Sequence, residues 1–420
     1  MARRTPARLE RAAPVLIEAA LVVLLLLPTV LGRLSTYIVL ILALFVVLRP
    51  GISARFAART PNPADGLFGL SFILVSLALL ASANEPRDLA YILNFSPFLL
   101  MAPLRWELES RPRPDAGLWV ARLALGGTVL SLGTALVQTL IFKATRVGQP
   151  IMNPFQFADT ALLLGFLALI GLLVPGQHRR WPFLIGPLAG IAAVMLSGTR
   201  GALLALPLLS VIAFGFALWR SRHRQAIALA GLALMGIAAL FIILAPSLGL
   251  NRATEAFQTL ASAVQGGTVD ESTEQRLTLY WGGLAAFLAN PIVGYGWGDM
   301  VPAIMPYVPA EMLPIVRTFR QLHNGLVSYA VGAGSLGILS FILVSIAPLV
   351  GVWRNRAKSA AQPWLYAALV LVGSYQIFQL TYILLGYEFH TLQYAVVTAI
   401  ILGYMPPAGS ADASGRKRGT

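Results

Sequence analysis

The sequence has no cysteine, few acidic residues and few charges of either sign. Without cysteine the chain has no disulfide, no thiol nucleophile and no cysteine-ligated metal site. Charged residues make up only 11% of the chain and hydrophobic residues 57%, and the mean hydropathy is +0.74. Because these values lie far outside the range of soluble globular domains, the composition predicts an integral membrane protein.

Apolar runs recur from one end of the sequence to the other. Their lengths suit α-helices that cross a bilayer, which need about 17–25 residues, whereas strands of a membrane barrel would alternate apolar and polar residues. The first run follows basic residues as in a signal peptide, but it is too long and lacks a clear cleavage site, so we expect an uncleaved span. The predicted fold class is an all-α bundle of twelve transmembrane helices, at residues 14–31, 34–48, 66–82, 89–104, 117–141, 154–174, 182–198, 201–218, 226–247, 325–352, 363–385 and 389–405.

The excess of positive charge follows from this topology and requires no nucleic-acid partner. Lys and Arg number 31 against 17 Asp and Glu, which gives a net charge of +14. In the twelve-span arrangement, 21 of these cations fall in one set of linkers and termini, and nine fall in the opposite set. Because Lys and Arg collect in cytoplasmic loops, we expect both termini in the cytoplasm.

The longest linker, residues 248–322, then lies on the extracytoplasmic side. Within it, Leu277, Trp281, Leu284 and Leu288 recur at helical spacing, which predicts a helix over residues 275–290 at the membrane surface or against the bundle. A turn rich in Gly and Pro follows, NPIVGYGWGDM. The expected organisation is transmembrane helices one to nine in residues 1–247, this loop in residues 248–322, helices ten to twelve in residues 323–405, and a cytoplasmic tail in residues 406–420.

Two arginines stand where the charge rule for membrane proteins does not place them. Arg200, in SGTRGALLAL, lies at a hairpin between two spans with almost no polar loop around it, and Arg276 starts the predicted loop helix. An arginine at membrane depth needs an anion, backbone carbonyls or interfacial water. Two planar guanidinium groups suit a diphosphate, since each pairs with two phosphate oxygens. The alternative for Arg200 is an arginine at a tight turn that reaches the membrane interface.

A histidine completes the candidate site where the chain re-enters the membrane, in RTFRQLHNGLVSYAVGAGSLGI. His323 can accept a proton from a hydroxyl at neutral pH when a nearby arginine keeps it uncharged. The alternative is a histidine that caps or packs a helix. Asn324 is expected to start the helix or to position the site. Arg317 and Arg320 either join the cationic pocket or pair with lipid headgroups or Glu311.

Metal chemistry is not expected from the pattern of acids and histidines. The acids on the outer side form no compact set of oxygen ligands, and the other three histidines are dispersed. We therefore predict no metal and no cofactor.

Three segments resemble, in the same order, the hallmarks of the O-antigen ligase and polymerase superfamily. These hallmarks are a Ser-x-x-Arg-Gly-Ala stretch, an Arg followed by a Trp-containing helix and Pro-x-x-Gly-x-Gly, and a His-Asn-x-x-Leu followed by Gly-x-x-Gly; the set covers residues 197–338. Upstream, GQPIMNPFQFADTALL is similar to the Asn-Pro-Asn-x-x-Ala element of the family. Phe155 stands where its second Asn is expected, so we assign that segment no role.

The resemblance implies a metal-independent, inverting membrane glycosyltransferase of the C type (GT-C). It implies a multi-pass protein of the bacterial inner membrane, with a periplasmic active site and an undecaprenyl-diphosphate-linked glycan as donor. His323 matches the essential histidine of the family, and Arg200 and Arg276 match its two essential arginines. The protein is assumed to be a monomer among membrane lipids.

The acceptor separates the activities within the superfamily. We favour an O-antigen ligase, whose acceptor is the lipid A core, because chain length, twelve spans and one large loop are more typical of ligases. A polymerase or a protein O-oligosaccharyltransferase is the alternative. A transporter or lipid flippase is a further alternative, because a polytopic bundle alone does not define function. Transport would predict charges deep in several spans, whereas the notable charges here lie at one face.

Overall fold

The computed structural model describes residues 5–48, 61–144, 146–175, 180–220, 271–353, 355–356 and 358–406. The side chains of residues 5–11, Arg200 and Arg220 lie outside the described part. So do the expected ninth span, residues 226–247, the first part of the large loop, and the tail after residue 406. The described residues are helical and contain no β-strand. The prediction of an all-α fold is confirmed for this part of the chain.

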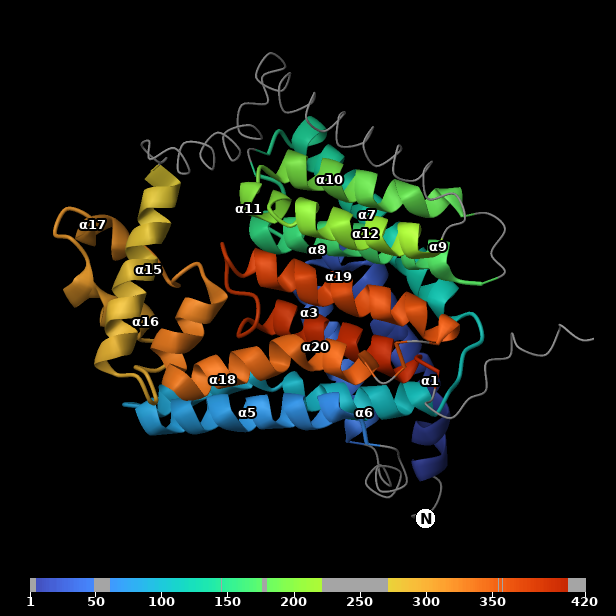
Figure 1. The fold of residues 1–420 in the computed structure, drawn as a ribbon, viewed down its shortest axis with the longest axis horizontal. Coiled ribbons are helices and arrows are strands. Elements are labelled where there is room, and N and C mark those ends of the chain that lie inside the picture. Colours follow the sequence, from blue (N-terminus) through green and yellow to red (C-terminus); the bar gives the residue numbers. More distant parts are fainter. Residues whose placement is uncertain are drawn as a thin grey trace, which may run out of the picture.

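The first half of the chain forms helices that run side by side (Figure 1). The packed pairs include α10 with both α7 and α8, and α1 with α3. The elements are α1 (Thr5–Leu26), α2 (Pro28–Leu31), α3 (Arg33–Val47), α5 (Pro63–Ser82), the 3₁₀-helix η1 (Pro86–Phe95), α6 (Phe98–Glu109), α7 (Ala116–Leu136), the π-helical turn η2 (Val137–Ile141), α8 (Pro154–Leu167), α9 (Ile170–Leu173), the 3₁₀-helix η3 (Trp181–Leu184), α10 (Ile185–Ser197), α11 (Arg200–Leu203) and α12 (Leu206–Arg220).

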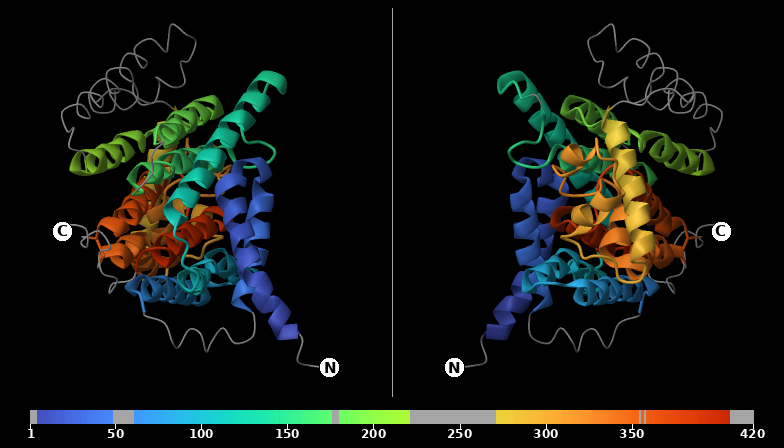
Figure 2. Two further views of the ribbon diagram at one scale, coloured as in Figure 1. Left: turned by 90° about the vertical axis from the view of Figure 1, so that its right-hand side faces the viewer. Right: turned by 90° about the vertical axis from the view of Figure 1, so that its left-hand side faces the viewer.

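The second half adds three long helices to the bundle and a group of helices at one end of it. The elements are α15 (Glu271–Ala289), α16 (Met300–Ile304), the 3₁₀-helix η4 (Met305–Tyr307), α17 (Leu313–Val316), α18 (Gly325–Trp353), the 3₁₀-helix η5 (Ser359–Ala361), α19 (Gln362–Phe378) and α20 (Glu388–Gly403). In Figure 1, α15 runs across the direction of the long helices, and Figure 2 shows it lying over the end of the bundle. The expected helix over residues 275–290 is therefore present as α15.

Asparagine side chains start three of the helices that position the site. Asn62 and Asn153, each followed by Pro, accept hydrogen bonds from Ala64 N (3.0 Å) and Phe155 N (2.9 Å) at the starts of α5 and α8. Asn324 accepts one from Val327 N (3.0 Å) at the start of α18. Because the first N–H groups of a helix have no partner within the helix, an Asn at this position is stabilising.

Polar bonds between helices hold the bundle together at its centre. Ser340 donates to Ser71 O (2.8 Å) and joins α18 to α5, while Tyr366 donates to Phe166 O (3.0 Å) and joins α19 to α8. Buried hydroxyls that bond across helices are typical of membrane bundles, where hydrophobic burial between helices contributes little. The stretch Pro154–Leu173 is buried along almost all of its length and forms the centre of the fold.

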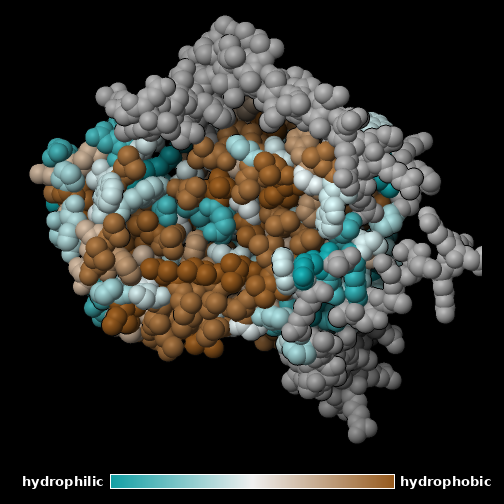
Figure 3. Space-filling model, in the orientation of Figure 1, coloured by the Kyte–Doolittle hydropathy of each residue, from teal (hydrophilic) through white to brown (hydrophobic). Residues whose placement is uncertain are grey.

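Five helices are long and apolar enough to cross a membrane: Pro63–Ser82, Ala116–Ile141, Pro154–Leu173, Gly201–Trp219 and Gly325–Trp353. Three shorter apolar helices accompany them, Ala12–Leu26, Arg33–Val47 and Trp181–Ser197. The surface over α5 and α18 is hydrophobic, and hydrophilic side chains lie toward both ends (Figure 3). The chain is thus a multi-pass membrane protein. The described residues do not establish twelve spans.

Two expected spans differ from the helices observed. The fourth, residues 89–104, is broken: η1 ends at Phe95, and α6 begins at Phe98 and continues to Glu109. The eleventh, residues 363–385, ends early, since α19 stops at Phe378. Ile383, Leu384 and Leu385 are fully buried in the loop that follows. Hydropathy does not distinguish an apolar loop packed inside protein from a segment that contacts lipid, and this explains the second error.

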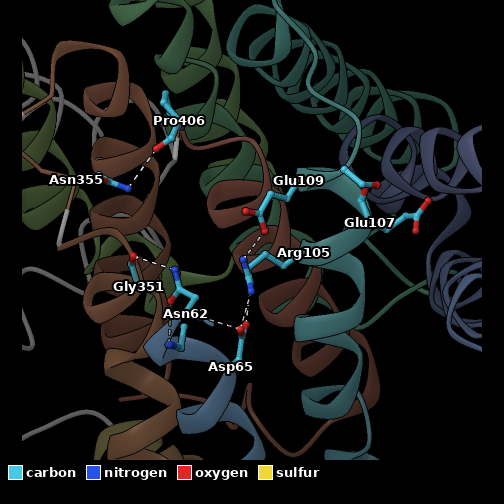
Figure 4. Close-up of polar contacts among 10 residues, drawn as sticks. Asn62, Asp65, Arg105, Glu107, Glu109, Gly351, Asn355 and Pro406 are labelled. Carbon is cyan, nitrogen blue, oxygen red and sulfur yellow. Dashed lines mark hydrogen bonds and ion pairs between the residues drawn. The ribbon is translucent and has the colours of Figure 1, made fainter. Parts of the chain in front are cut away.

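Polar and charged side chains from several helices meet at one end of the bundle. There Arg105 forms two hydrogen bonds with the Asp65 carboxylate (2.9 and 2.7 Å) and one with Glu109 (2.8 Å), as Figure 4 shows. Beside this cluster, Asn62 donates to Gly351 O (3.2 Å) and Asn355 to Pro406 O (3.2 Å). The ends of α6, α18 and α20 therefore meet the start of α5, as expected if these segments lie on the same side of the membrane.

Candidate functional site

His323 lies at the opposite end of the bundle, immediately before α18. Its backbone has a φ of +52°, a left-handed conformation that costs a non-glycine residue about 1–2 kcal/mol. The neighbouring Asn324 caps α18, and its carbonyl accepts a hydrogen bond from the Ser328 hydroxyl (2.6 Å). The prediction that Asn324 starts the helix is therefore confirmed. Strained residues of this kind gather at functional sites, where the surrounding structure maintains them.

The His323 ring is enclosed by aromatic side chains from three parts of the chain. Its centroid lies 5.3 Å from that of Phe319, 6.2 Å from Tyr382 and 6.3 Å from Phe155. Nδ1 is buried and has no hydrogen-bond partner among the described residues. The side-chain amide of Gln379, which packs against Gly325, is also buried without a partner there. Buried polar groups without partners are rare and suggest a site for a ligand or for chemistry.

The surroundings of His323 favour the neutral imidazole. Burial is the main cause and the positive charge of Arg276 adds to it, so the pKa of His323 is lowered from 6.5 to about 4. A hydrogen bond with the main chain of Thr381 counteracts part of the shift in this pKa. At neutral pH the ring is therefore uncharged.

Helix α15 brings Arg276 to this histidine. Gly282 and Gly283 let α15 approach closely, since a methyl group at Gly283 would collide with Val327 of α18. One turn before these glycines, the Tyr280 hydroxyl lies 3.0 Å from His323 O and 2.6 Å from Leu380 O, so it can donate to either carbonyl. Arg276 is one further turn away and partly buried. Tyr280 thus ties the helix that carries Arg276 to both segments that surround His323.

The apolar face of α15 was expected either at the membrane surface or against the bundle. Leu277, Trp281, Leu284 and Leu288 are 42–69% exposed, and the residues packed against the bundle are Leu279, Gly282, Gly283 and Ala286. The Leu277–Leu288 face therefore does not contact the bundle. Its apolar character suits a helix at the membrane surface, the other position predicted for it.

The glycine-rich turn after α15 fits into a break in α18. Gly334 has a φ of +61°, and a side chain there would collide with Ile292 O. Backbone bonds close the contact: Tyr295 N donates to Val331 O (2.9 Å) and Ser335 N donates to Pro291 O (2.7 Å). The two glycine-rich motifs of the sequence therefore bind to each other, and this fixes α15 relative to α18.

Arg200 starts α11, directly after the hairpin that closes α10. Gly198 ends α10 in the left-handed conformation (φ +66°), and the Thr199 hydroxyl donates to Pro154 O (3.3 Å). A methyl group at Gly201 would collide with the side chain of Thr381, the residue whose main chain bonds to the His323 ring. Thr381 thus lies between the backbone beside Arg200 and the His323 ring. The Arg200 side chain itself lies outside the described part.

The remaining predicted residues lie near the surface of this region. Arg317 and Arg320 are both exposed, and neither forms an ion pair with Glu311 within the described residues. Of the two, Arg320 is close enough to Tyr387 to oppose, by its charge, the rise in the Tyr387 pKa caused by burial. Arg320 therefore lies near Tyr387, whereas no contact among the described residues connects Arg317 with the site.

Four residues near His323 were not predicted: Phe155, Tyr280, Thr381 and Tyr382. The ring of Phe155 stacks on that of Tyr382, with centroids 5.1 Å apart and an angle of 8° between the planes. The guanidinium carbon of Arg146 lies 5.9 Å from the centroid of the Phe155 ring. Thr381 and Tyr382 stand in the loop that hydropathy assigned to a span. Polar residues within that run, QLTY, were the available signal.

Potential metal ligands are dispersed in the described residues. No group of three His, Asp or Glu side chains lies close enough there to hold an ion. The charge that lowers the His323 pKa is that of Arg276.

Comparison with known protein families gives a match that includes part of this site. Residues 185–342 match the family model described as O-antigen ligase. The predicted resemblance to the O-antigen ligase superfamily is confirmed. No curated protein matches the chain. The O-antigen ligase match runs from the start of α10 into α18, so it includes Arg200, Arg276 and His323, whereas Phe155, Thr381 and Tyr382 come from outside it.

Proposed function

We propose that the protein is an O-antigen ligase that transfers a glycan from undecaprenyl diphosphate to the lipid A core at the periplasmic face of the bacterial inner membrane. The observation that carries the proposal is a neutral, partly buried histidine beside an arginine, within the segment that matches the family. The match supports the superfamily and, in general terms, a lipid-linked glycan and a lipid A core as partners. The reaction, the topology and the GT-C fold are our inference.

In this reaction His323 acts as general base. The acceptor hydroxyl gives its proton to the imidazole, and its oxygen attacks the anomeric carbon of the donor glycan from the side opposite the diphosphate. The bond between the anomeric carbon and the diphosphate oxygen breaks with inversion, and its electron pair remains on the diphosphate. Arg200 and Arg276 bind that group and stabilise the charge that develops on it, which is typically the largest contribution to such catalysis. These arginines supply the positive charge, and the mechanism needs no metal.

The donor itself strengthens the base in this mechanism. In the free protein burial, and to a smaller extent the charge of Arg276, lower the pKa of His323 to about 4, and a base this weak accepts a proton poorly at neutral pH. A diphosphate bound to Arg276 offsets the positive charge. The pKa of His323 then rises toward the working pH, because imidazolium is no longer repelled. His323 becomes an effective base only when the donor is in place.

Incubation of the purified protein in detergent with lipid-linked oligosaccharide and lipid A core tests the proposal. A ligase gives one capped lipid A product. A ladder of lengthened lipid-linked chains would indicate a polymerase and contradict the ligase assignment. Consumption of donor in detergent, where no second compartment exists, distinguishes both from a transporter or flippase.

A further inference from the structure

A cavity of about 710 Å³ opens at the same end of the bundle as His323, and its lining differs from that of the candidate site. It lies between the starts of α3, α8, α16 and α20 and the 3₁₀-helix η1, and it is lined by residues including Arg33, Asn94, Gln156, Asp299 and Tyr382. The volume is within the range of small-molecule sites, roughly 300–1,000 Å³. Arg33, Tyr37 and Glu388 on its wall are exposed, so the cavity is open to the outside.

A row of aromatic rings connects this cavity with His323. Phe155 stacks on Tyr382, and Tyr382 stacks on Tyr387 with centroids 6.0 Å apart and an angle of 20° between the planes. Tyr382 and Tyr387 both line the cavity. The Tyr382 ring also packs edge-on against the His323 ring, with 6.2 Å between the two ring centroids. A molecule in the cavity is therefore separated from the histidine by one tyrosine side chain.

The charges on the wall disfavour the diphosphate as the occupant. Two arginines, Arg33 and Arg87, face three carboxylates, Asp88, Asp299 and Glu388. Arg87 is already paired with Glu85 (2.9 Å). The excess of negative charge repels a multiply charged anion, so an uncharged ligand with hydroxyl groups fits this wall better.

Several polar groups on the wall are not used by the fold. Within the described residues, the side chains of Asn94 and Gln156 form no hydrogen bond, and Asp299 at the start of α16 makes no capping bond. Gln156 is only 8% exposed. Sugar hydroxyls both donate and accept hydrogen bonds, so amides and carboxylates pair with them, while tyrosine rings cover their apolar faces.

We propose that this cavity binds a saccharide portion of one of the two substrates and presents it to His323 past Tyr382. The proposal rests on the transferase function proposed above. The shared chemistry is an uncharged sugar ring, which both the donor glycan and the lipid A core contain. Which of the two occupies the cavity is decided by the kinetic test below.

Asn94→Ala and Asp299→Asn remove one ligand group each, and Ala90→Trp fills the cavity from an exposed position on its wall. The matched controls are Asn84→Ala and Glu311→Gln, which change exposed side chains of the same kind outside the lining. Each variant is purified in detergent, its melting temperature is measured, and KM is determined for donor and acceptor separately. We expect a rise of about tenfold in one KM for the first two variants, since one hydrogen bond is lost. Ala90→Trp is expected to raise it further, with kcat little changed.

A rise in the acceptor KM alone assigns the cavity to the lipid A core sugar, and a rise in the donor KM alone assigns it to the donor glycan. Unchanged values of both KM for all three cavity variants, with an active wild-type protein, contradict the cavity assignment and leave the transferase function standing. A wild-type protein that transfers nothing contradicts the proposed function instead. Binding of isolated core oligosaccharide and of donor-derived oligosaccharide, measured by saturation-transfer NMR with wild type and Ala90→Trp, then still tests the cavity; equal signals for the two proteins with both sugars contradict it.

Discussion

The two ends of the bundle use their positive charges in different ways. At one end Arg105, only 3% exposed, is held by two carboxylates, Asp65 and Glu109. At the other, burial lowers the pKa of His323, and Arg276 lies close enough to lower it further. The first arrangement stabilises the fold, because opposite charges are paired where they are buried. The second favours the neutral form of a partly buried base, and a shift of this kind is typical of functional sites.

The largest expected effect separates catalysis at one end from stability at the other. His323→Ala is expected to lower the transfer rate per folded molecule 10²–10⁴-fold, since a general base contributes about that factor. Arg105→Met is expected to reduce stability by about 3–5 kcal/mol, because the Asp65 carboxylate loses its partner. Transfer per folded molecule should stay near the wild-type value. Transfer assays and thermal unfolding of both purified variants check this, and a fully active His323→Ala protein would remove the base from the mechanism.

The next effect concerns the geometry of the cation near His323. Arg276→Lys keeps the charge but loses the planar fork, so kcat/KM for the donor is expected to fall about 10²-fold. Arg317→Lys, at an exposed position without a contact to the site among the described residues, is the control and should change kcat/KM less than twofold. Steady-state kinetics with lipid-linked donor measure both. Full activity of Arg276→Lys would contradict bidentate binding of the diphosphate.

A smaller effect is expected from the backbone beside Arg200. Gly201→Ala pushes against Thr381, which bonds to the His323 ring, so the transfer rate should fall about tenfold as the ring shifts. Gly215→Ala, in the same helical segment and with no described residue within 4 Å of the added carbon, should have the wild-type rate. Equal rates for the two variants would show that Thr381 does not position the histidine.

The smallest effect is a gain in stability. Asn tolerates the left-handed backbone at position 323 better than His, so His323→Asn is expected to stabilise the protein by about 0.5–1 kcal/mol at pH 7. Below pH 6.5 the unfolded histidine binds a proton that the folded one excludes until about pH 4. Wild-type stability therefore falls as the pH drops through this window, and the advantage of the variant grows. Melting temperatures of the two proteins at pH 7 and pH 5 measure this advantage. A difference between variant and wild type that is the same at both pH values would contradict a lowered His323 pKa.

The sequence predicted the parts of this architecture that depend on local rules. Hydropathy located most of the helices, the spacing of Leu277 and Trp281 indicated α15, and Asn324 was expected to start α18. The residues that surround His323 were identified from the three-dimensional structure and not from the sequence. Phe155, Thr381 and Tyr382 are distant from His323 in the sequence, and the first of them departs from the family pattern. Helical spacing identified the apolar face of α15 but not the face that packs on the bundle, because Gly282 and Gly283 form that contact.

The most direct test of the account is the acid limb of the pH profile. In wild-type protein, kcat/KM for the donor reports the free enzyme and should fall with a midpoint near pH 4, while kcat reports the donor complex and should fall at a higher pH. Arg276→Gln removes the repulsion but not the burial, which is the larger cause of the shift, so its kcat/KM midpoint should rise from about pH 4 but stay below 6.5, and the gap between the two profiles should narrow; Arg276→Lys should keep the wild-type profile. A wild-type kcat/KM midpoint at 6.5 or above that Arg276→Gln does not move would contradict the account.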